Sequence, residues 1–200
     1  MDRTDKKLRG ANATDSSHTA LLLIDFINDF SFKAAEELLP HARAAAEATA
    51  HLKARARRAG VPCVYVNDNF GRWRSQFDQV LEHCMRRGMR GREIAQRLAP
   101  SAQDYFVLKP KHSGFYMTPL ALLLESLGAQ RLILTGLLAD SCVTFTANDA
   151  YLRGYRLCVP GDCVASMQPG HVEQALAYMQ RTLKAEVCTA QSLRLDTRKP

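Results

Sequence analysis

The sequence lacks the features of an exported or membrane-embedded protein. Its longest apolar segments, 20–24 and 132–139, are far shorter than the roughly 20 residues that span a bilayer. Residues 1–18 contain basic and acidic side chains but no apolar stretch ending in small residues, so they do not resemble a signal peptide. We therefore expect a soluble, cytoplasmic protein without membrane contact.

The sequence also lacks a disulfide framework. Its six cysteines stand in apolar contexts and form no CxxC pair, which suits a reducing compartment. Because free cysteine is among the most buried residue types, most of the six are expected to be small core residues. At most one of them is expected to do chemistry.

Linkers and internal repeats are absent as well, and the alanine run in 34–59 is the one low-complexity tract. The 200 residues, 46% hydrophobic and 24% charged, are enough to bury one substantial core without metals or disulfides. We expect a single domain over 19–200. The polar stretch 1–18 has no apolar periodicity, which predicts a mobile N-terminal tail.

The formal net charge of +7 raises the alternative of a nucleic-acid partner. Two local clusters carry much of the basic charge: Arg55, Arg57 and Arg58, and then Arg86, Arg87, Arg90 and Arg92. They lie in helix-like, Glu-containing stretches without interleaved aromatic residues, which indicates solvated helix faces. We expect no nucleic-acid partner, although the charge can steer an anionic substrate.

Short, nearly all-apolar runs alternate with helical patterns along the chain. The runs cover residues 20–25, 61–67, 105–109, 131–135, 155–159 and 185–189. The helical patterns cover 34–59, 118–127, 140–153 and 170–184, and residues 68–100 form a long loop with one or two helical pieces. Strands without polar alternation are typical of a parallel sheet covered on both faces. The pattern predicts a three-layer α/β/α, Rossmann-like fold.

Three chemically reactive side chains follow predicted strands. Asp25 ends the first apolar run, Lys109 ends the third, and Cys142 stands where a helix begins after the fourth. Each has a plain alternative: a helix cap, a surface lysine and a small core residue. Since open α/β sheets bind ligands at the carboxyl ends of their strands, we expect the three to gather in one crevice.

The three residue types make chemical sense together. A helix N-terminus and a nearby ammonium both favour the thiolate form of a cysteine. A carboxylate in reach can accept the thiol proton and later activate water. Backbone N–H groups of Ala139 and Cys142 are candidates for an oxyanion hole.

Three segments resemble the signature blocks of the isochorismatase-like cysteine hydrolases. They are 21–30 (LLLIDFINDF), 107–120 (VLKPKHSGFYMTPL) and 134–166, in the family's order, and the resemblance covers 19–189. It implies a six-stranded parallel sheet and an Asp–Lys–Cys triad at Asp25, Lys109 and Cys142. It also implies a homo-oligomer, dimer or tetramer, and a non-proline cis peptide between Leu138 and Ala139.

Two departures from relatives narrow the expected reaction. The metal-binding histidines of nicotinamidases have no counterpart in the loop 67–73 (NDNFGRW). Asp68 alone is a poor metal site and His83 is interpreted as a surface residue, so we expect no metal and no cofactor. True isochorismatases cleave a vinyl ether without a nucleophilic cysteine, whereas Cys142 is present here. The resemblance therefore implies the thiol-dependent branch, which cleaves C–N bonds.

Residues near the strand ends are candidates for the substrate pocket. They are Phe26, Asn69, Trp73, His112, Phe115 and Leu138. Aromatic walls with a few polar groups are usual in small-ligand sites, but simple packing explains the same residues. Asp162, after the fifth strand, is interpreted as a structural carboxylate that caps nearby amides.

The sequence thus favours a metal-independent hydrolase that cleaves a small amide, ureide or carbamoyl substrate through a covalent acyl-enzyme on Cys142. Two alternatives stay open: vinyl ether hydrolysis of the isochorismatase type, and a non-catalytic binding module that kept the fold. The expected partners are a small-molecule substrate and further copies of the chain. The sequence does not identify the substrate.

Overall fold

A computed structural model of the chain describes residues 17–71 and 76–195. Its strands are β1 (Thr19–Ile24), β2 (Cys63–Asp68), β3 (Tyr105–Lys109), β4 (Arg131–Leu137), β5 (Arg156–Pro160), β6 (Val164–Ala165) and β7 (Glu186–Cys188). Its helices are α2 (Ala35–Arg58), α3 (Phe77–Met85), α4 (Arg92–Arg97), α5 (Leu120–Ser126), α6 (Thr144–Leu152) and α7 (Pro169–Leu183). Two short helical turns, η1 (Ala139–Val143) and η2 (Gly161–Cys163), complete the elements.

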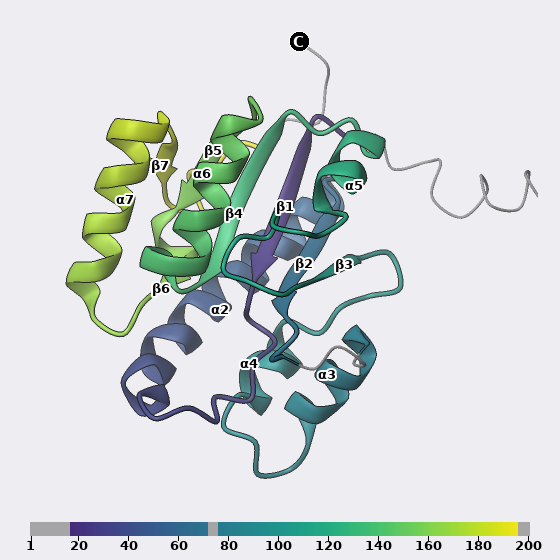
Figure 1. Cartoon of the computed structure of the whole chain (residues 1–200), viewed down its shortest axis with the longest axis vertical. Coiled ribbons are helices and arrows are strands. Elements are labelled where there is room, and N and C mark those ends of the chain that lie inside the picture. The colour runs from purple at the N-terminus through teal and green to yellow at the C-terminus, as the bar shows by residue number, and fades with distance from the viewer. Residues whose placement is uncertain (1–16, 72–75, 196–200) are drawn as a thin grey trace, which may run out of the picture.

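Within the described residues the strands form one sheet in the order β3-β2-β1-β4-β5-β7, with β6 paired to β4 (Figure 1). Every recorded strand pair is parallel. The predicted parallel α/β sheet is confirmed, and each of the six predicted strands is present with small shifts at its ends. The two-residue strand β6 adds a seventh.

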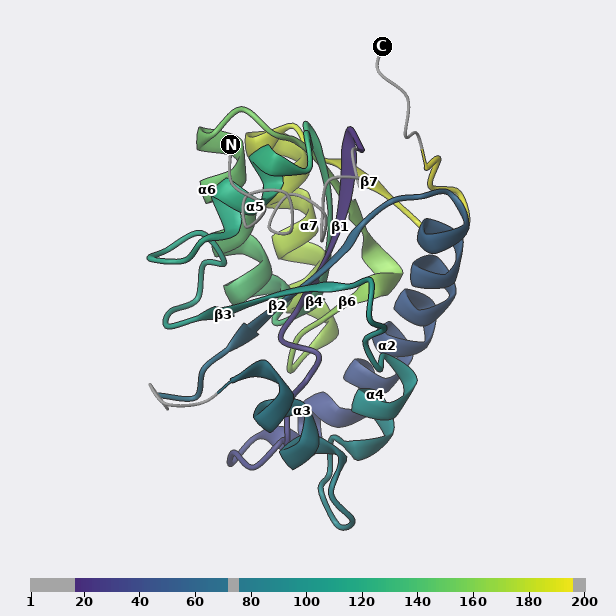
Figure 2. The same cartoon turned by 90° about the vertical axis from the view of Figure 1, so that its right-hand side faces the viewer.

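Helices cover both faces of the sheet (Figure 2). Along β1, Leu21 and Leu23 face the cluster that contains α2, α3 and α4. Leu22 and Ile24 face the cluster that contains α5, α6 and α7. Because successive strand side chains point to opposite faces, a strand buried on both sides must be apolar at every position. That is why residues 20–24 of β1 form an unbroken apolar run.

The folded unit begins earlier than predicted. The Ser17 N–H donates to the Leu127 carbonyl at 2.9 Å, and the His18 carbonyl accepts from the N–H groups of Gln130 and Arg131, each at 2.9 Å. Ser17 and His18 are therefore part of the domain and not of a tail, while the rest of the predicted tail lies outside the described residues. No helix in 17–71 or 76–195 is long and apolar enough to cross a membrane.

A buried ion pair ties α2 to the start of β3. Lys53 Nζ lies 2.7 Å from Asp104 Oδ2, and the two side chains are 8% and 4% exposed. The same ammonium donates to the Tyr65 hydroxyl at 2.7 Å and to the Ala99 carbonyl at 3.0 Å. These bonds join a helix, a central strand and the loop after α4, so they fix the edge strand that ends in Lys109.

Replacing one partner of this pair should destabilise the fold strongly. Asp104→Ala leaves the Lys53 ammonium buried without its carboxylate, and we expect a loss of about 3 to 5 kcal/mol in the free energy of unfolding. The measurement is urea denaturation at constant pH. Glu93→Ala, which breaks the exposed pair with Arg43, is the control and should cost less than about 1 kcal/mol. Equal losses in the two variants would contradict the importance of the buried pair.

Candidate active site

Asp25 is the first residue after β1 and turns the chain away from the sheet. Its backbone has φ 54°, a left-handed conformation that aspartate tolerates better than most residues. Its N–H donates to the Val66 carbonyl at 3.0 Å, and its Oδ1 accepts from the Asp68 N–H at 2.7 Å. The carboxylate is thus fixed at the carboxyl ends of β1 and β2.

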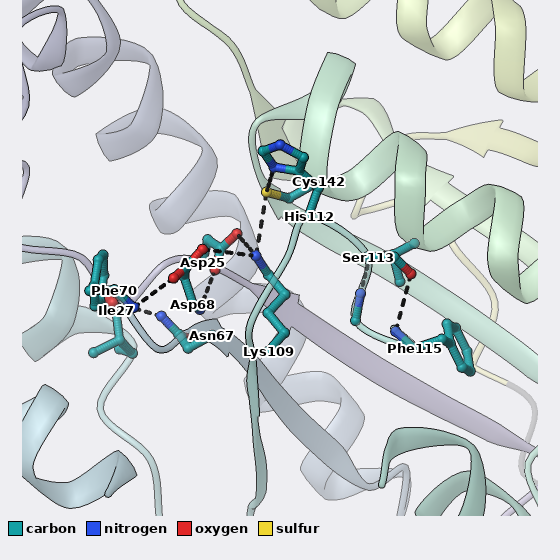
Figure 3. A network of polar contacts seen from close by, with 12 residues as sticks. Asp25, Ile27, Asn67, Asp68, Phe70, Lys109, His112, Ser113, Phe115 and Cys142 are labelled. Atoms are coloured by element: carbon teal, nitrogen blue, oxygen red, sulfur yellow. Dashed lines mark hydrogen bonds and ion pairs between the residues drawn. The ribbon is translucent and has the colours of Figure 1, made fainter. Parts of the chain in front are cut away.

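Lys109 ends the edge strand β3, yet its side chain is fully buried. Figure 3 shows its ammonium pointing across the sheet edge toward Asp25 and Cys142. Nζ lies 2.8 Å from Asp25 Oδ2 and 3.4 Å from Cys142 Sγ. Asp25 is also close enough to Cys142 for its charge to raise the pKa of the thiol. The structure therefore brings the three predicted triad residues into one cluster.

Cys142 is positioned by the junction between β4 and α6. At Gly136, where φ is 136°, an added Cβ would lie 2.1 Å from the Ile24 carbonyl oxygen, so only glycine lets β4 pass β1 here. The non-proline cis peptide joins Leu137 and Leu138. The predicted position, between Leu138 and Ala139, is therefore wrong by one residue.

The helix that carries Cys142 opens with the π-helical turn η1 and not with regular α-helix. Such turns are rare and occur often at functional sites. The Leu138 carbonyl accepts from the N–H groups of Ser141 and Val143, each at 3.1 Å. These bonds close the turn around the cysteine.

A second contact that holds η1 was missed from the sequence. Ser166 Oγ donates to Asp140 Oδ1 at 2.5 Å, and His171 Nδ1 lies 3.4 Å from Asp140 Oδ2. Asp140 thus connects η1, the turn that contains Cys142, to the segment after β6 and to the first turn of α7. No local pattern indicates this, because the partners are 26 and 31 positions away along the chain.

Burial and mutual charge decide where the protons lie. Burial raises the pKa of the Asp25 carboxyl, and Lys109 with the hydrogen bonds lowers it by less, so that this pKa is above its ordinary value. Burial lowers the pKa of the Lys109 ammonium, but Asp25 and the other acidic groups raise it by more. Lys109 therefore stays protonated.

The thiol of Cys142 keeps its proton at rest. Burial, and next the charge of Asp25, raise the pKa of Cys142 to about 12. Lys109 lowers this pKa, in the direction expected of a nearby ammonium, but by less. At neutral pH the thiol is therefore neutral, and Asp25 lies beside it in contact with Lys109, where it is placed to receive the thiol proton.

Three predicted pocket residues lie beside this cluster or on the loops next to it. His112 Nδ1 is 3.8 Å from Cys142 Sγ, and its ring stacks on Phe145 with centroids 5.4 Å apart. The Asn69 N–H donates to the Lys109 carbonyl at 3.1 Å, which joins the ends of β2 and β3. Leu138 is partly buried next to η1.

The aromatic candidates have other surroundings. Phe26 is fully buried in the core on the α2 side of the sheet. Phe115 is 5% exposed and lies in Figure 3 beyond Ser113, away from the sulfur. Its ring packs 6.0 Å from that of Tyr155 and carries a cation–π contact with Arg153. Trp73 lies outside the described residues.

Asp68 is a charged neighbour of the three triad residues. From the sequence, it was weighed only as a metal ligand. Its Oδ2 lies 3.7 Å from Lys109 Nζ, and its side chain is 36% exposed. The strand register explains this closeness, since Asp68 on β2 pairs directly with Lys109 on β3. Asp162 accepts a hydrogen bond from the Ala190 N–H at 2.7 Å, as predicted for a capping carboxylate. The Nε2 atom of His83 lies 2.9 Å from Asp29 Oδ2.

A parallel α/β sheet with a carboxylate, an ammonium and a thiol at its carboxyl edge defines a hydrolase of the isochorismatase-like fold. The Isochorismatase domain model matches residues 19–192. The chain belongs to the isochorismatase family, and the expected resemblance is confirmed.

Individual relatives agree with this assignment. The isochorismatase family protein YaaI of Bacillus subtilis is 38% identical over 174 residues, covering 87% of this chain and 95% of its own. The maleamate amidohydrolase of Pseudomonas putida is 30% identical over 153 residues, covering 72% and 71% of the two chains. The structure of N-carbamoylsarcosine amidase from Thermoplasma acidophilum is similar with a TM-score of 0.68 and 31% identity, over 88% of this chain and 99% of the other.

The charge of Asp25 should be measurable through the reactivity of the neighbouring thiol. Asp25→Asn removes a negative charge that raises the pKa of Cys142 and leaves Lys109 in place, so the pKa should fall by about 1 to 3 units. The measurement is the pH midpoint of iodoacetamide labelling at Cys142, followed by peptide mass spectrometry. Asp29→Asn, which changes a carboxylate paired with His83, should leave the midpoint unchanged. An unchanged midpoint in Asp25→Asn would show that Asp25 does not act on the thiol.

Proposed function

We propose that the protein is a cysteine hydrolase that cleaves a C–N bond of a small amide, ureide or carbamoyl substrate through an acyl-enzyme on Cys142. The observation that carries the proposal is the position of Lys109 Nζ, 2.8 Å from Asp25 Oδ2 and 3.4 Å from Cys142 Sγ. Two relatives support the bond type, because their names are amidohydrolase and amidase. Covalent catalysis by a thiol is supported because Cys142 has a general base, Asp25, in the same cluster.

In the first half of the reaction Asp25 takes the proton from Cys142 Sγ while the sulfur attacks the substrate carbonyl carbon. Since the thiol is neutral at rest, proton removal has to accompany attack and not precede it. Lys109 stays protonated and offsets the negative charge as it moves from the carboxylate to the sulfur. The ammonium therefore stabilises the transition state without transferring a proton.

The developing oxyanion requires hydrogen-bond donors close to the sulfur. We propose the backbone N–H groups of Ala139 and Cys142, both in η1. The first N–H groups of a helical segment have no partner within the helix, so they are available to an anionic oxygen.

Collapse of the tetrahedral intermediate breaks the C–N bond, and the leaving nitrogen takes the proton that Asp25 received. The acyl group then remains on the sulfur as a thioester. In the second half Asp25 removes a proton from water as the water attacks the thioester carbonyl. The acid leaves, the proton returns to the thiol, and no metal takes part. His112, 3.8 Å from the sulfur, and Asn69 and Leu138 are the proposed contacts of the substrate.

The proposal includes self-association, with the substrate and further copies of the chain as partners. Several large apolar side chains on and near α5 and α6 are exposed: Met117 by 83%, Leu122 by 71%, Phe145 by 53% and Leu152 by 79%. Large apolar side chains exposed to this extent are candidates for a contact between subunits. One of them, Phe145, stacks on His112, next to the proposed substrate site.

The role of the sulfur can be tested directly. On a panel of small amides, ureides and carbamoyl compounds, Cys142→Ala should lower kcat/KM by at least about 10³-fold for any compound that the native protein hydrolyses. Intact-mass spectrometry during turnover should detect an acyl adduct on native Cys142 and none on the variant. Cys63→Ala, a buried cysteine on β2, is the matched control. Full turnover by Cys142→Ala would refute the mechanism.

The absence of a metal from the reaction can be tested separately. Incubation with a strong chelator followed by desalting should leave kcat/KM unchanged for every compound in the panel, because the attacking group is a thiol and water is activated by Asp25. Carbonyl polarisation would come from backbone N–H groups and not from a Lewis acid. Activity that disappears with chelator at an unchanged Tm and returns with added Zn²⁺ or Mn²⁺ would show that the reaction depends on a metal.

A further inference from the structure

A second pair of cysteines lies outside the active site, on adjacent strands near the other edge of the sheet. Cys158 is on β5 and Cys188 on β7, and their sulfur atoms are 3.6 Å apart. The register places Cys158 opposite Glu186 and Pro160 opposite Cys188. Because side chains two positions apart on a strand point to the same face, Glu186 and Cys188 share the face of Cys158.

These three residues form a cluster with the composition of a metal site. One ligand atom from each of Cys158, Glu186 and Cys188 lies within 4.8 Å of the other two, and no other group of this kind is found in 17–71 and 76–195. Cys158 is fully buried, Cys188 is partly buried and Glu186 is exposed. The cluster therefore opens to solvent on the side of Glu186.

The distance between the two sulfur atoms distinguishes a disulfide from a metal site. A disulfide requires about 2.0 Å between sulfurs and Cα atoms closer than about 6.8 Å. Neighbouring strands lie about 4.8 Å apart and a parallel strand rises about 3.3 Å per residue, so Cα atoms two positions out of register are about 8 Å apart. A disulfide here would therefore require backbone movement. Two sulfurs bound to one tetrahedral zinc at about 2.3 Å are about 3.8 Å apart. The observed 3.6 Å between Sγ atoms matches the metal geometry.

We propose that Cys158, Cys188 and Glu186 bind a thiophilic divalent cation, Zn²⁺, with water as the fourth ligand. Two thiolates and a carboxylate are ligands that zinc accepts in proteins. Binding displaces one proton from each thiol to solvent and forms two Zn–S bonds and one Zn–O bond. No oxidant or reductant is needed.

Binding should depend on pH. Each thiol has to lose its proton before its sulfur binds the ion, so the affinity should rise with pH. The charged groups that face the pair are Arg131, Glu186 and Asp162.

Arg131 keeps the third ligand in place. Its Nη2 lies 2.7 Å from Glu186 Oε2, and its Nη1 donates to the Arg194 carbonyl at 2.9 Å. A carboxylate has two oxygens, so one can stay with the guanidinium while the other binds the ion. A supporting bond of this type orients the ligand, as partners behind metal ligands commonly do.

Bound zinc would fasten the last strand of the described sheet. β7 has three residues, and β5 is its one strand partner in the described sheet. An ion bridging Cys158 and Cys188 links these strands through side chains in addition to the backbone. The site would therefore stabilise the folded chain in proportion to its occupancy.

The test uses the full-length reduced protein in a Cys142→Ser background, so that the catalytic thiol cannot act as a ligand. Co²⁺ titration should give a thiolate-to-metal charge-transfer band with one equivalent bound, and Zn²⁺ should displace the Co²⁺. Adding Cys158→Ser or Cys188→Ser should weaken binding by more than about 100-fold, since loss of a supporting partner alone costs about 10- to 100-fold. Glu186→Gln should weaken it less, and Cys63→Ser should not change it.

A second measurement uses the native sequence, so it does not depend on whether a variant folds. In the native sequence, Zn²⁺ should protect Cys188 from alkylation and raise Tm, while alkylation of Cys84 stays unchanged. Stoichiometric Co²⁺ binding that survives Cys158→Ser and Cys188→Ser would overturn the proposal. So would a charge-transfer band that never forms, or mild oxidation that joins the two cysteines in a protein that binds no metal.

Discussion

The buried ion pair between Lys109 and Asp25 is the interaction on which the rest of the site depends. A fully buried ammonium is costly unless a carboxylate lies against it, and here the separation is 2.8 Å. The pair joins the ends of β3 and β1, which are separated in the sheet by β2. The edge strand must therefore stay in register, and the buried contact of Lys53 with Asp104 at its start helps to hold it.

Burial and the same pair together set the protonation of the Cys142 thiol. Burial raises its pKa most, Asp25 raises it next, and Lys109 lowers it by less, so the sulfur keeps its proton at rest. A neutral buried thiol reacts slowly with electrophiles that do not engage the site. In the proposed mechanism, proton transfer to Asp25 is part of the attack itself, and the acyl-enzyme forms only where a carbonyl is correctly placed.

Much of the fold could be predicted because its signals are local. The apolar run of β1 is buried on both faces. Burial on both faces requires apolar residues at consecutive positions, which can be recognised in the sequence. Features that depend on distant partners could not be predicted. Ser17 joins the domain through Leu127, and Asp140 is held by Ser166, contacts that leave no periodic pattern. Phe26 and Phe115 were candidates for the pocket, yet both lie in apolar cores, because an aromatic residue at a strand end suits either place.

The sequence by itself determined the family, the order of the elements and the three residues expected to form the triad, because strand ends and signature segments are local properties of the chain. Only the tertiary structure decided where the protons lie, where the cis peptide falls and which neighbours surround the thiol. A pKa depends on burial and on charges brought together from different strands. The pairing of Cys158 with Cys188 also depends on strand register, since their 30-residue separation carries no information about a distance of a few ångströms.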